Sequence, residues 1–282
     1  MIESKALYRR RCRLFFITCL GAVLSFAGTA LAATDEVVLP AHVQQGAMVI
    51  GKVPAGSRVA YDGRTLDVTD YGTIVFGVGR DARGSARVAV TPPDGQPRRV
   101  AVEIRPREFP VERINGVPPK TVSPPPAIAE RIAREQQAVS RARATSNNGL
   151  GFAQHFIRPV EGRISGRFGN QRIYNGTPGS AHSGMDIAAA TGTPVKAPAS
   201  GEVVLAEPDL YLTGGTVLID HGYGIGSNFL HLSRLDVAVG DTVEQGEIIG
   251  AVGATGRATG PHLHWGMTWF STRIDPLLVL QR

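Results

Sequence analysis

Turn-forming residues interrupt this chain along its whole length: 34 of its 282 residues are glycine and 19 are proline. Between the turns stand short runs of apolar and β-branched residues, for example 73–76 and 215–219. Such runs are typical of strands, and the dipeptide Asp62-Gly63 is a hairpin signal. The spacing therefore predicts a mainly β protein, and a content of 43% hydrophobic residues is enough for a folded core.

The first 32 residues have the pattern of a secretory signal peptide. Basic residues end at Arg13, an uncharged and mostly apolar run covers 14–27, and small residues lead up to Ala32. We expect cleavage after Ala32, with Ala33 as the alternative site. The competing interpretation is an uncleaved membrane anchor, because residues 14–33 are nearly long enough to span a bilayer.

Both cysteines, Cys12 and Cys19, lie in this leader. The predicted mature chain therefore has no disulfide, no thiol nucleophile and no thiolate ligand, so any metal site must use His, Asp or Glu. The net charge of +6 is also concentrated in the leader, where five basic residues stand against Glu3 alone. The rest of the chain is close to neutral, which argues against nucleic acid as a partner.

Composition divides the predicted mature chain into three segments. Residues 33–117 show short apolar runs at a spacing typical of a small β-sandwich of immunoglobulin-like type, without any cluster of catalytic residue types. Residues 118–149 begin with a proline-rich spacer and continue with good helix formers over 127–144, which predicts an amphipathic linker helix. Residues 150–282 are rich in glycine and β-branched residues, which predicts a compact antiparallel β-domain.

Five of the seven histidines fall between residues 182 and 264, within that second β-domain. Because side chains alternate along a strand, His262 and His264 face the same way, and His182 shares a face with Asp186. Catalytic zinc typically takes three nitrogen or oxygen ligands and keeps one position open. These two pairs offer four such groups, so a surplus histidine remains for acid–base chemistry.

Several short motifs surround these histidines in a fixed order. They are 162–169 (GRISGRFG), 182–188 (HSGMDIA), 192–195 (GTPV), 220–222 (DHG), 230–233 (LHLS) and 255–264 (TGRATGPHLH). Together they resemble the lysostaphin-type, LytM-like zinc metallopeptidases of family M23, over about 156–276. The stretch 48–80 and the helix around Arg131 resemble, more loosely, the N-terminal region of exported Gram-negative members. The resemblance implies a C-terminal antiparallel β-domain of the LytM type.

The resemblance also implies roles for single residues. His182, Asp186 and His264 match the family's zinc ligands, while His262 and His231 match its two catalytic histidines. His262 is our first choice as general base, being beside the ligand His264. His231 would then stabilise the oxyanion or pass a proton to the leaving amine. Which of these two histidines is the base stays open.

Three further positions deserve separate interpretation. Phe229 is a departure, because many members of the family have a tyrosine two residues before the catalytic histidine. Tyr174 lies where some members place an oxyanion-stabilising tyrosine, but its spacing is not a close match, and its role stays open. His221, in an Asp-His-Gly turn, is interpreted as structural.

The function that follows from the resemblance is a zinc-dependent peptidoglycan endopeptidase of the periplasm. Its substrates would be peptidoglycan stem peptides and cross-bridges, and in a Gram-negative wall the bond would be the D-alanyl–diaminopimelate link. The alternative is a non-catalytic LytM-type regulator that activates cell-wall amidases, although every metal ligand is retained here. A lipoyl or biotinyl carrier, suggested by 240–250, is disfavoured because no lysine follows Lys196.

The N-terminal β-domain carries no visible chemistry, so we expect it to act on the second domain or on a partner. Its aromatic residues Tyr61, Tyr71 and Phe76 are dispersed, which does not suggest a wall-binding strip. We therefore favour a cover over the zinc groove, or a site for a membrane or protein regulator, over wall targeting. The oligomeric state is not indicated by the sequence.

Overall fold

The computed structural model describes residues 36–117 and 122–282, so the predicted signal peptide lies outside the described residues. Strands make up most of the regular structure, which confirms the mainly β fold class. The described residues belong to one compact unit. Among them, no helix is both long enough and apolar enough to cross a membrane.

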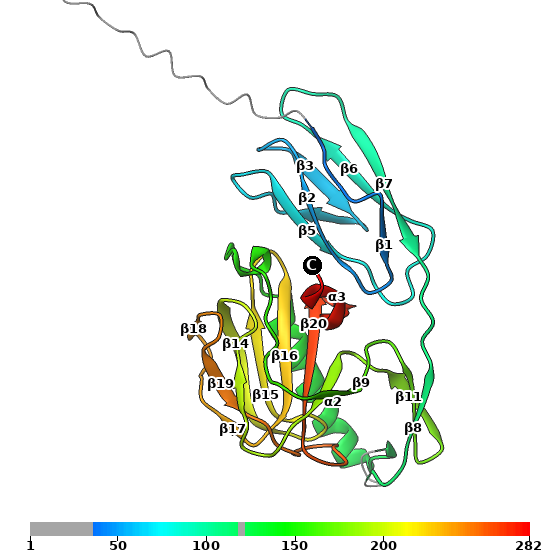
Figure 1. Ribbon diagram of the computed structural model, residues 1–282, viewed down its shortest axis with the longest axis vertical. Helices are drawn as coiled ribbons and strands as arrows, with labels where there is room; N and C mark the ends of the chain where they lie inside the picture. Colours follow the sequence, from blue (N-terminus) through cyan, green and yellow to red (C-terminus); the bar gives the residue numbers. More distant parts are fainter. Residues whose placement is uncertain (1–35, 118–121) are drawn as a thin grey trace, which may run out of the picture. The chain divides into compact units, whose positions relative to one another are not determined.

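Two sheets form the N-terminal β-domain (Figure 1). Their buried side chains, such as Ile74, Phe76 and Val88, belong to one core cluster. The turn at Asp62-Gly63 joins two neighbouring strands, and both residues have positive φ, as a two-residue hairpin turn requires. The five-stranded sheet contains β1 (His42–Gln44), β7 (Arg98–Arg105), β6 (Ser85–Thr91), β3 (Arg58–Tyr61) and β4 (Arg64–Leu66), and the two-stranded sheet contains β2 (Met48–Lys52) and β5 (Thr73–Gly77).

A large antiparallel sheet dominates the C-terminal β-domain. Its path is β18 (Thr242–Val243), β14 (Gly201–Leu210), β15 (Gly214–Asp220), β16 (Ile225–Leu232), β20 (His262–Trp269), β12 (Met185–Ala188) and β9 (Arg163–Gly166), with β21 (Thr272–Ile274) paired to β20. A smaller sheet contains β13 (Pro194–Lys196), β19 (Ile248–Ala251) and β17 (Arg234–Leu235). Leu263 and Trp265 are fully buried in the core, so the alternating positions His262 and His264 lie on the other face of β20.

A third sheet joins segments from both sides of residue 117. Strand β8 (Val111–Ile114) pairs in parallel with β10 (Gln171–Tyr174), which pairs in turn with β11 (Thr177–Ala181). The register places Glu112 opposite Arg172. The domain boundary at residue 117 stays a prediction, but β8, which precedes it, is hydrogen-bonded to a strand that follows it.

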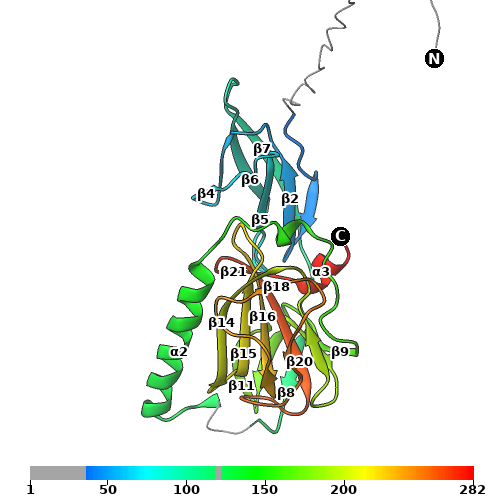
Figure 2. The ribbon, with the colours of Figure 1, turned by 90° about the vertical axis from the view of Figure 1, so that its left-hand side faces the viewer.

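The linker helix is present as α2 (Pro126–Ala144), within one residue of the predicted range. Figure 2 shows it alongside β14 and β15. Arg131 donates to the backbone carbonyl of Asp209, and Glu135 accepts a hydrogen bond from the backbone N–H of Tyr211 at 2.8 Å. These contacts dock α2 on the C-terminal β-domain. Among the described residues, the other helices are the 3₁₀ turn η1 (Gly151–Ala153) and α3 (Pro276–Leu280).

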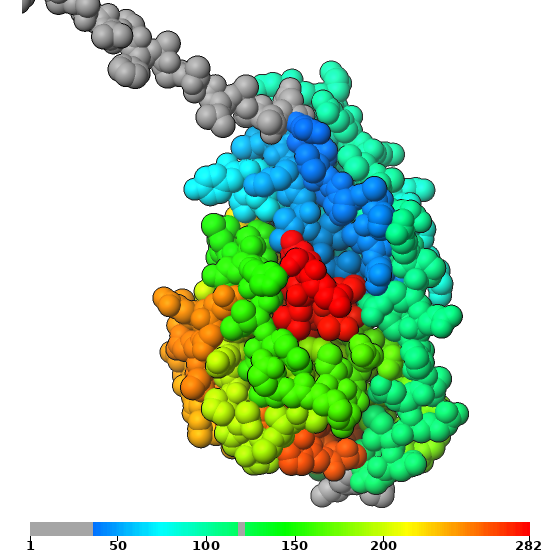
Figure 3. All heavy atoms as spheres, in the orientation of Figure 1, coloured from blue at the N-terminus to red at the C-terminus, as the bar shows by residue number. Residues whose placement is uncertain are grey.

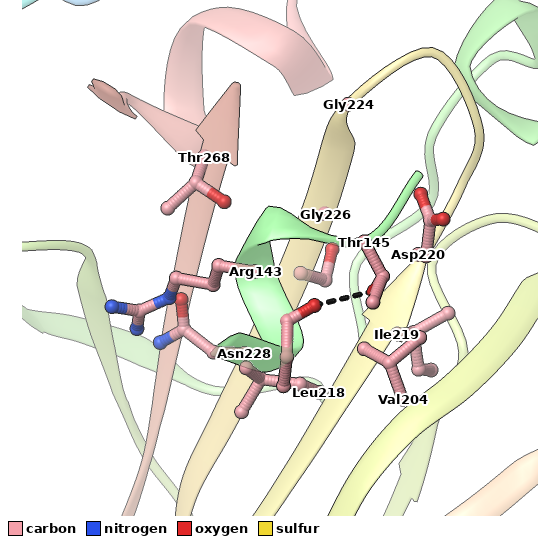
Figure 4. A pocket seen from close by; sticks show the side chains of 12 residues that line it. Arg143, Thr145, Val204, Leu218, Ile219, Asp220, Gly224, Gly226, Asn228 and Thr268 are labelled. Carbon is pink, nitrogen blue, oxygen red and sulfur yellow. Dashed lines mark hydrogen bonds between the residues drawn. The ribbon is translucent and has the colours of Figure 1, made fainter. Parts of the chain in front are cut away.

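The end of α2 lies over the face of the large sheet. Figure 4 shows Arg143 and Thr145 there, across from Asn228 and Thr268 of the sheet. A small cavity of about 20 Å³ separates the two sides, which is room for one water molecule. The Nε atom of Arg143 is buried without a hydrogen-bond partner among the described residues.

The N-terminal β-domain contacts the end of β20 that is distant from His262. The ring of Tyr61 lies 5.7 Å from that of Trp269, and Arg107 forms an ion pair with Asp275 at 2.8 Å. The Asp275 backbone N–H also donates to the carbonyl of Gly46. Figure 3 shows the last residues of the chain beside this contact. The sandwich therefore packs away from the predicted zinc site, and β8 is the part of the N-terminal half that approaches it.

Candidate metal centre

The pairing of β12 with β20 brings two predicted ligands together. The antiparallel register places Asp186 directly opposite His264, and His182 reaches the same point from just before β12. Asp186 Oδ1 lies 3.0 Å from His182 Nε2 and 2.9 Å from His264 Nδ1, and the two histidine nitrogens are 3.0 Å apart. The three side chains are buried.

This triangle of donor atoms fits a metal ion. Ligands held about 2 Å from one tetrahedral ion are roughly 3.3 Å from one another, close to the separations observed. Two imidazole nitrogens and one carboxylate oxygen are also the donor types that suit zinc in a site without thiolates. The structure thus brings the three predicted ligands into a single candidate metal site.

Protonation and orientation favour metal binding. His182 Nδ1 lies 2.9 Å from the carbonyl oxygen of Arg167, so its N–H donates there and Nε2 presents its lone pair to the site. Burial lowers the pKa of His264 to about 3, which keeps its imidazole neutral. Burial raises the pKa of Asp186, but its close contacts with His182 and His264 outweigh burial and hold that pKa well below its usual value.

The two remaining histidines of the site flank the triangle. His231, the second-to-last residue of β16, has a left-handed backbone (φ 66°), and its Nδ1 donates to the carbonyl oxygen of Thr255 at 2.7 Å. His262 Nδ1 donates likewise to the carbonyl of Gly260 at 2.8 Å. Their ring centroids are 4.8 Å apart. Both rings are therefore anchored through Nδ1, which leaves each Nε2 available to the site.

A support for the metal ligands was not predicted from the sequence. Arg172 on β10 forms an ion pair with Asp186 Oδ2, the oxygen turned away from the histidines. Glu112 on β8 lies 3.3 Å from Arg172 Nε through one oxygen and accepts a hydrogen bond of 2.6 Å from Asn170 through the other. No motif marks Glu112, which stands 60 residues before its partner, so the sequence offered no signal for this pair.

Two cavities adjoin the metal centre, and Arg172 lines both of them. The first, of about 430 Å³, is lined by Glu112 to Ile114 and by His262; we call it the β8 cavity. The second, of about 320 Å³, is lined by Arg172, Arg257 and Arg273 together with His182, His231 and His264; we call it the arginine cavity. An extended ligand can therefore lie across the metal centre with room on both sides.

Other predicted positions have simpler environments. His221 is fully buried between the carbonyl of Ser200 and the hydroxyl of Ser227, each at 2.8 Å, in agreement with its interpretation as structural. Phe229 is buried opposite Trp265. Tyr174 lines the arginine cavity, where the guanidinium of Arg257 lies 4.5 Å from its ring centre.

Fold and donor set together define a β protein with the metal site of a metallopeptidase. The sequence pattern of peptidase family M23 matches residues 180–276, which include every ligand and both flanking histidines. A protein from Pseudomonas aeruginosa classed with peptidase M23 is 31% identical, with a TM-score of 0.65, over 84% of this chain and 94% of its own. The chain belongs to peptidase family M23.

Curated relatives are similar to part of this chain. The cell division protein DipM of Caulobacter vibrioides is 34% identical over 57% of this chain, and the peptidoglycan DD-endopeptidase ShyA of Vibrio cholerae is 41% identical over 42%. These matches span only 26% and 28% of the relatives' own lengths. The chain therefore matches only about a quarter of the length of these relatives.

Proposed function

We propose that this protein is a zinc-dependent endopeptidase that hydrolyses peptide cross-links of peptidoglycan. The observation that carries the proposal is the convergence of His182, Asp186 and His264 within 3.0 Å of one another, with His231 and His262 beside them. Support for the substrate comes from ShyA, a peptidoglycan DD-endopeptidase by name. The predicted leader supports a periplasmic location for the mature chain.

The fit of the donor set indicates that His182, Asp186 and His264 would hold the zinc ion. When bound, zinc supplies Lewis acidity, which lowers the pKa of water toward about 7 and polarises the scissile carbonyl. The chain's own contribution is proton transfer and orientation. His262, our choice as general base, accepts a proton at Nε2 while its Nδ1–H remains fixed on Gly260.

His231 is the second histidine that can transfer protons in this site. Burial, followed by the neighbouring charge of His262, lowers its pKa to about 4, so the ring is neutral at neutral pH. Its Nε2 can accept a hydrogen bond or carry a proton to the leaving nitrogen, while the Thr255 carbonyl holds Nδ1. The 4.8 Å spacing of the two rings allows both to serve one scissile amide.

The decisive experiment is digestion of purified Gram-negative and Gram-positive peptidoglycan by the mature protein, with the products identified by mass. We expect new amino and carboxyl termini within cross-links, and about one zinc per chain by metal analysis. A protein with zinc that releases no peptide product would contradict the proposal. A protein without zinc that instead activates a purified amidase would favour the regulator alternative.

A further inference from the structure

The arginine cavity has an unusual charge composition for a space beside a metal centre. Three arginines line it, and none of its lining residues is an aspartate or glutamate. The lining also includes His182 and His264, so the cavity opens directly onto the proposed zinc ligands. A group bound at the metal centre would therefore place its neighbouring atoms among guanidinium groups.

The three arginines come from separate elements and have different partners. Arg172 on β10 is already paired with Asp186 and Glu112, so its charge is balanced within the protein. Arg257, in the loop before β20, lies over the ring of Tyr174 at 4.5 Å, which fixes its guanidinium plane. In the strand register Arg273 of β21 lies opposite Thr268 of β20. Because Thr268 and His264 are four residues apart on β20, Arg273 shares the face of His264.

Arg273 brings positive charge that no carboxylate of the described residues balances by an ion pair. Its side chain is exposed, so a ligand can reach it. Its charge also acts on Arg143, whose pKa falls to about 10 through burial and then through the nearby Arg273. An anion in the arginine cavity would balance the charge of Arg273.

We infer that the arginine cavity is a subsite for a free carboxylate on the substrate, located on the amine side of the scissile bond. This inference rests on the proposed function. In a D-alanyl–diaminopimelate link, the carbon bonded to the scissile nitrogen carries a free carboxyl group, two bonds from that nitrogen. Arginine binds such a carboxylate through paired, charge-assisted hydrogen bonds. An internal bridge of glycines offers no carboxylate at this position.

The substrate class that follows is a cross-link formed on the amino group of a residue with a free α-carboxylate. Arg257 and Arg273 would hold that carboxylate, and Arg172 would position Asp186. The arginine cavity would thereby select diaminopimelate-type cross-links over uncharged bridges. The β8 cavity, which contains Glu112, would take the acyl side of the bond.

The test uses two synthetic cross-linked peptides that differ only in this group, a carboxylate in one and a carboxamide in the other. We expect the mature protein to cleave the carboxylate peptide with a kcat/KM roughly 10- to 100-fold higher. Arg273→Gln and Arg257→Gln should each lower that value toward the carboxamide level, mainly through KM, with a much smaller effect on the carboxamide peptide. Arg87→Gln, an exposed arginine of β6, is the matched control.

A binding measurement decides the question without turnover. The amine-side product, as carboxylate or carboxamide, is titrated calorimetrically into zinc-loaded and chelator-treated protein. Preference for the carboxylate in both forms, lost in Arg273→Gln and partly kept in Arg273→Lys, supports the subsite. Equal binding of both products, or arginine variants that affect both peptides equally, would overturn it. Absence of cleavage of either peptide would count against the proposed function alone, because the binding result still decides on the subsite.

Discussion

The two carboxylate oxygens of Asp186 face two different regions of the molecule. Oδ1 meets His182, just before β12, and His264 on β20, and both lie within the residues that match peptidase family M23. Oδ2 meets Arg172, which is held by Glu112 from a strand that precedes the linker. One side of this residue serves the metal, and the other side is held by charges from a different sheet.

The two sides of Asp186 therefore have different roles: the Oδ1 side binds the metal, and the Oδ2 side holds the carboxylate in position. On the Oδ1 side, no other group in the site can replace a histidine ligand. The charges on the Oδ2 side act on the metal only through Asp186. Such outer partners orient a ligand and set its basicity, and their loss typically costs about 10- to 100-fold in metal affinity. Substitutions on the two sides should therefore differ in size.

His264→Ala is expected to have the largest effect. It removes one of three ligands, and we expect zinc affinity to fall by more than about 100-fold and peptidase activity to be lost. Zinc content and chelator competition provide the measurement, and His155→Ala, which changes an exposed histidine, is the control. Full zinc occupancy in the His264→Ala protein would show that the ligand is assigned incorrectly.

His262→Ala and His231→Ala should lower turnover without removing the metal. General acid–base groups are worth about 10²- to 10⁴-fold in rate, and neither histidine belongs to the triangle of donor atoms. We expect zinc content equal to that of the unmodified protein, with kcat reduced within that range. A variant that proves metal-free would make the altered histidine a ligand.

Glu112→Gln tests the Oδ2 side. Without the Glu112 charge, Arg172 withdraws more electron density from Asp186, so we expect zinc affinity to fall roughly 10-fold. Arg172→Gln combined with Glu112→Gln should cost less than the sum of the single changes, because the two residues act as a pair. Glu108→Gln, at an exposed position nearby, is the matched control. Additive effects would indicate that the pair does not act through Asp186.

His221 provides a contrast to the site histidines, since it is also buried but lies outside the metal centre. Burial lowers its pKa to about 4, from an ordinary value of 6.5. Below pH 6.5 the His221 imidazole is protonated in the unfolded chain, whereas in the folded chain it stays neutral down to about pH 4. Stability should therefore fall as the pH drops through this window, by roughly 3 kcal/mol from this group. Urea unfolding of His221→Gln should show a shallower decline; an identical slope would contradict this.

The sequence was sufficient for the parts of the site that lie on adjacent antiparallel strands. Strand alternation placed His262 and His264 on one face, and the pairing of β12 with β20 confirms that Asp186 joins them. The hairpin at Asp62-Gly63 and the helix over 127–144 were also predictable, because each depends on local residue preferences.

The supporting pair was not predictable for a physical reason. Strands β8 and β10 are parallel, so they need a long connection, and no short turn or local pattern records their register. The left-handed backbone of His231 was equally hidden, because that conformation is uncommon for a residue other than glycine. The sequence led us to expect that the N-terminal β-domain covers the zinc groove; among the described residues of that domain, those of β8 line a cavity beside the site.

Because β8 pairs with β10, the sheets around the metal centre contain strands from both sides of the linker. Any fragment that begins after residue 117 lacks one strand and the counter-charge of Arg172. Such a fragment, for instance 150–282, should bind zinc less tightly than the mature chain. A separate peptide that contains Val111–Ile114 should restore the missing strand by addition to the free edge of β10. The strength of the metal centre would then depend on the concentration of a second polypeptide, as in a split enzyme.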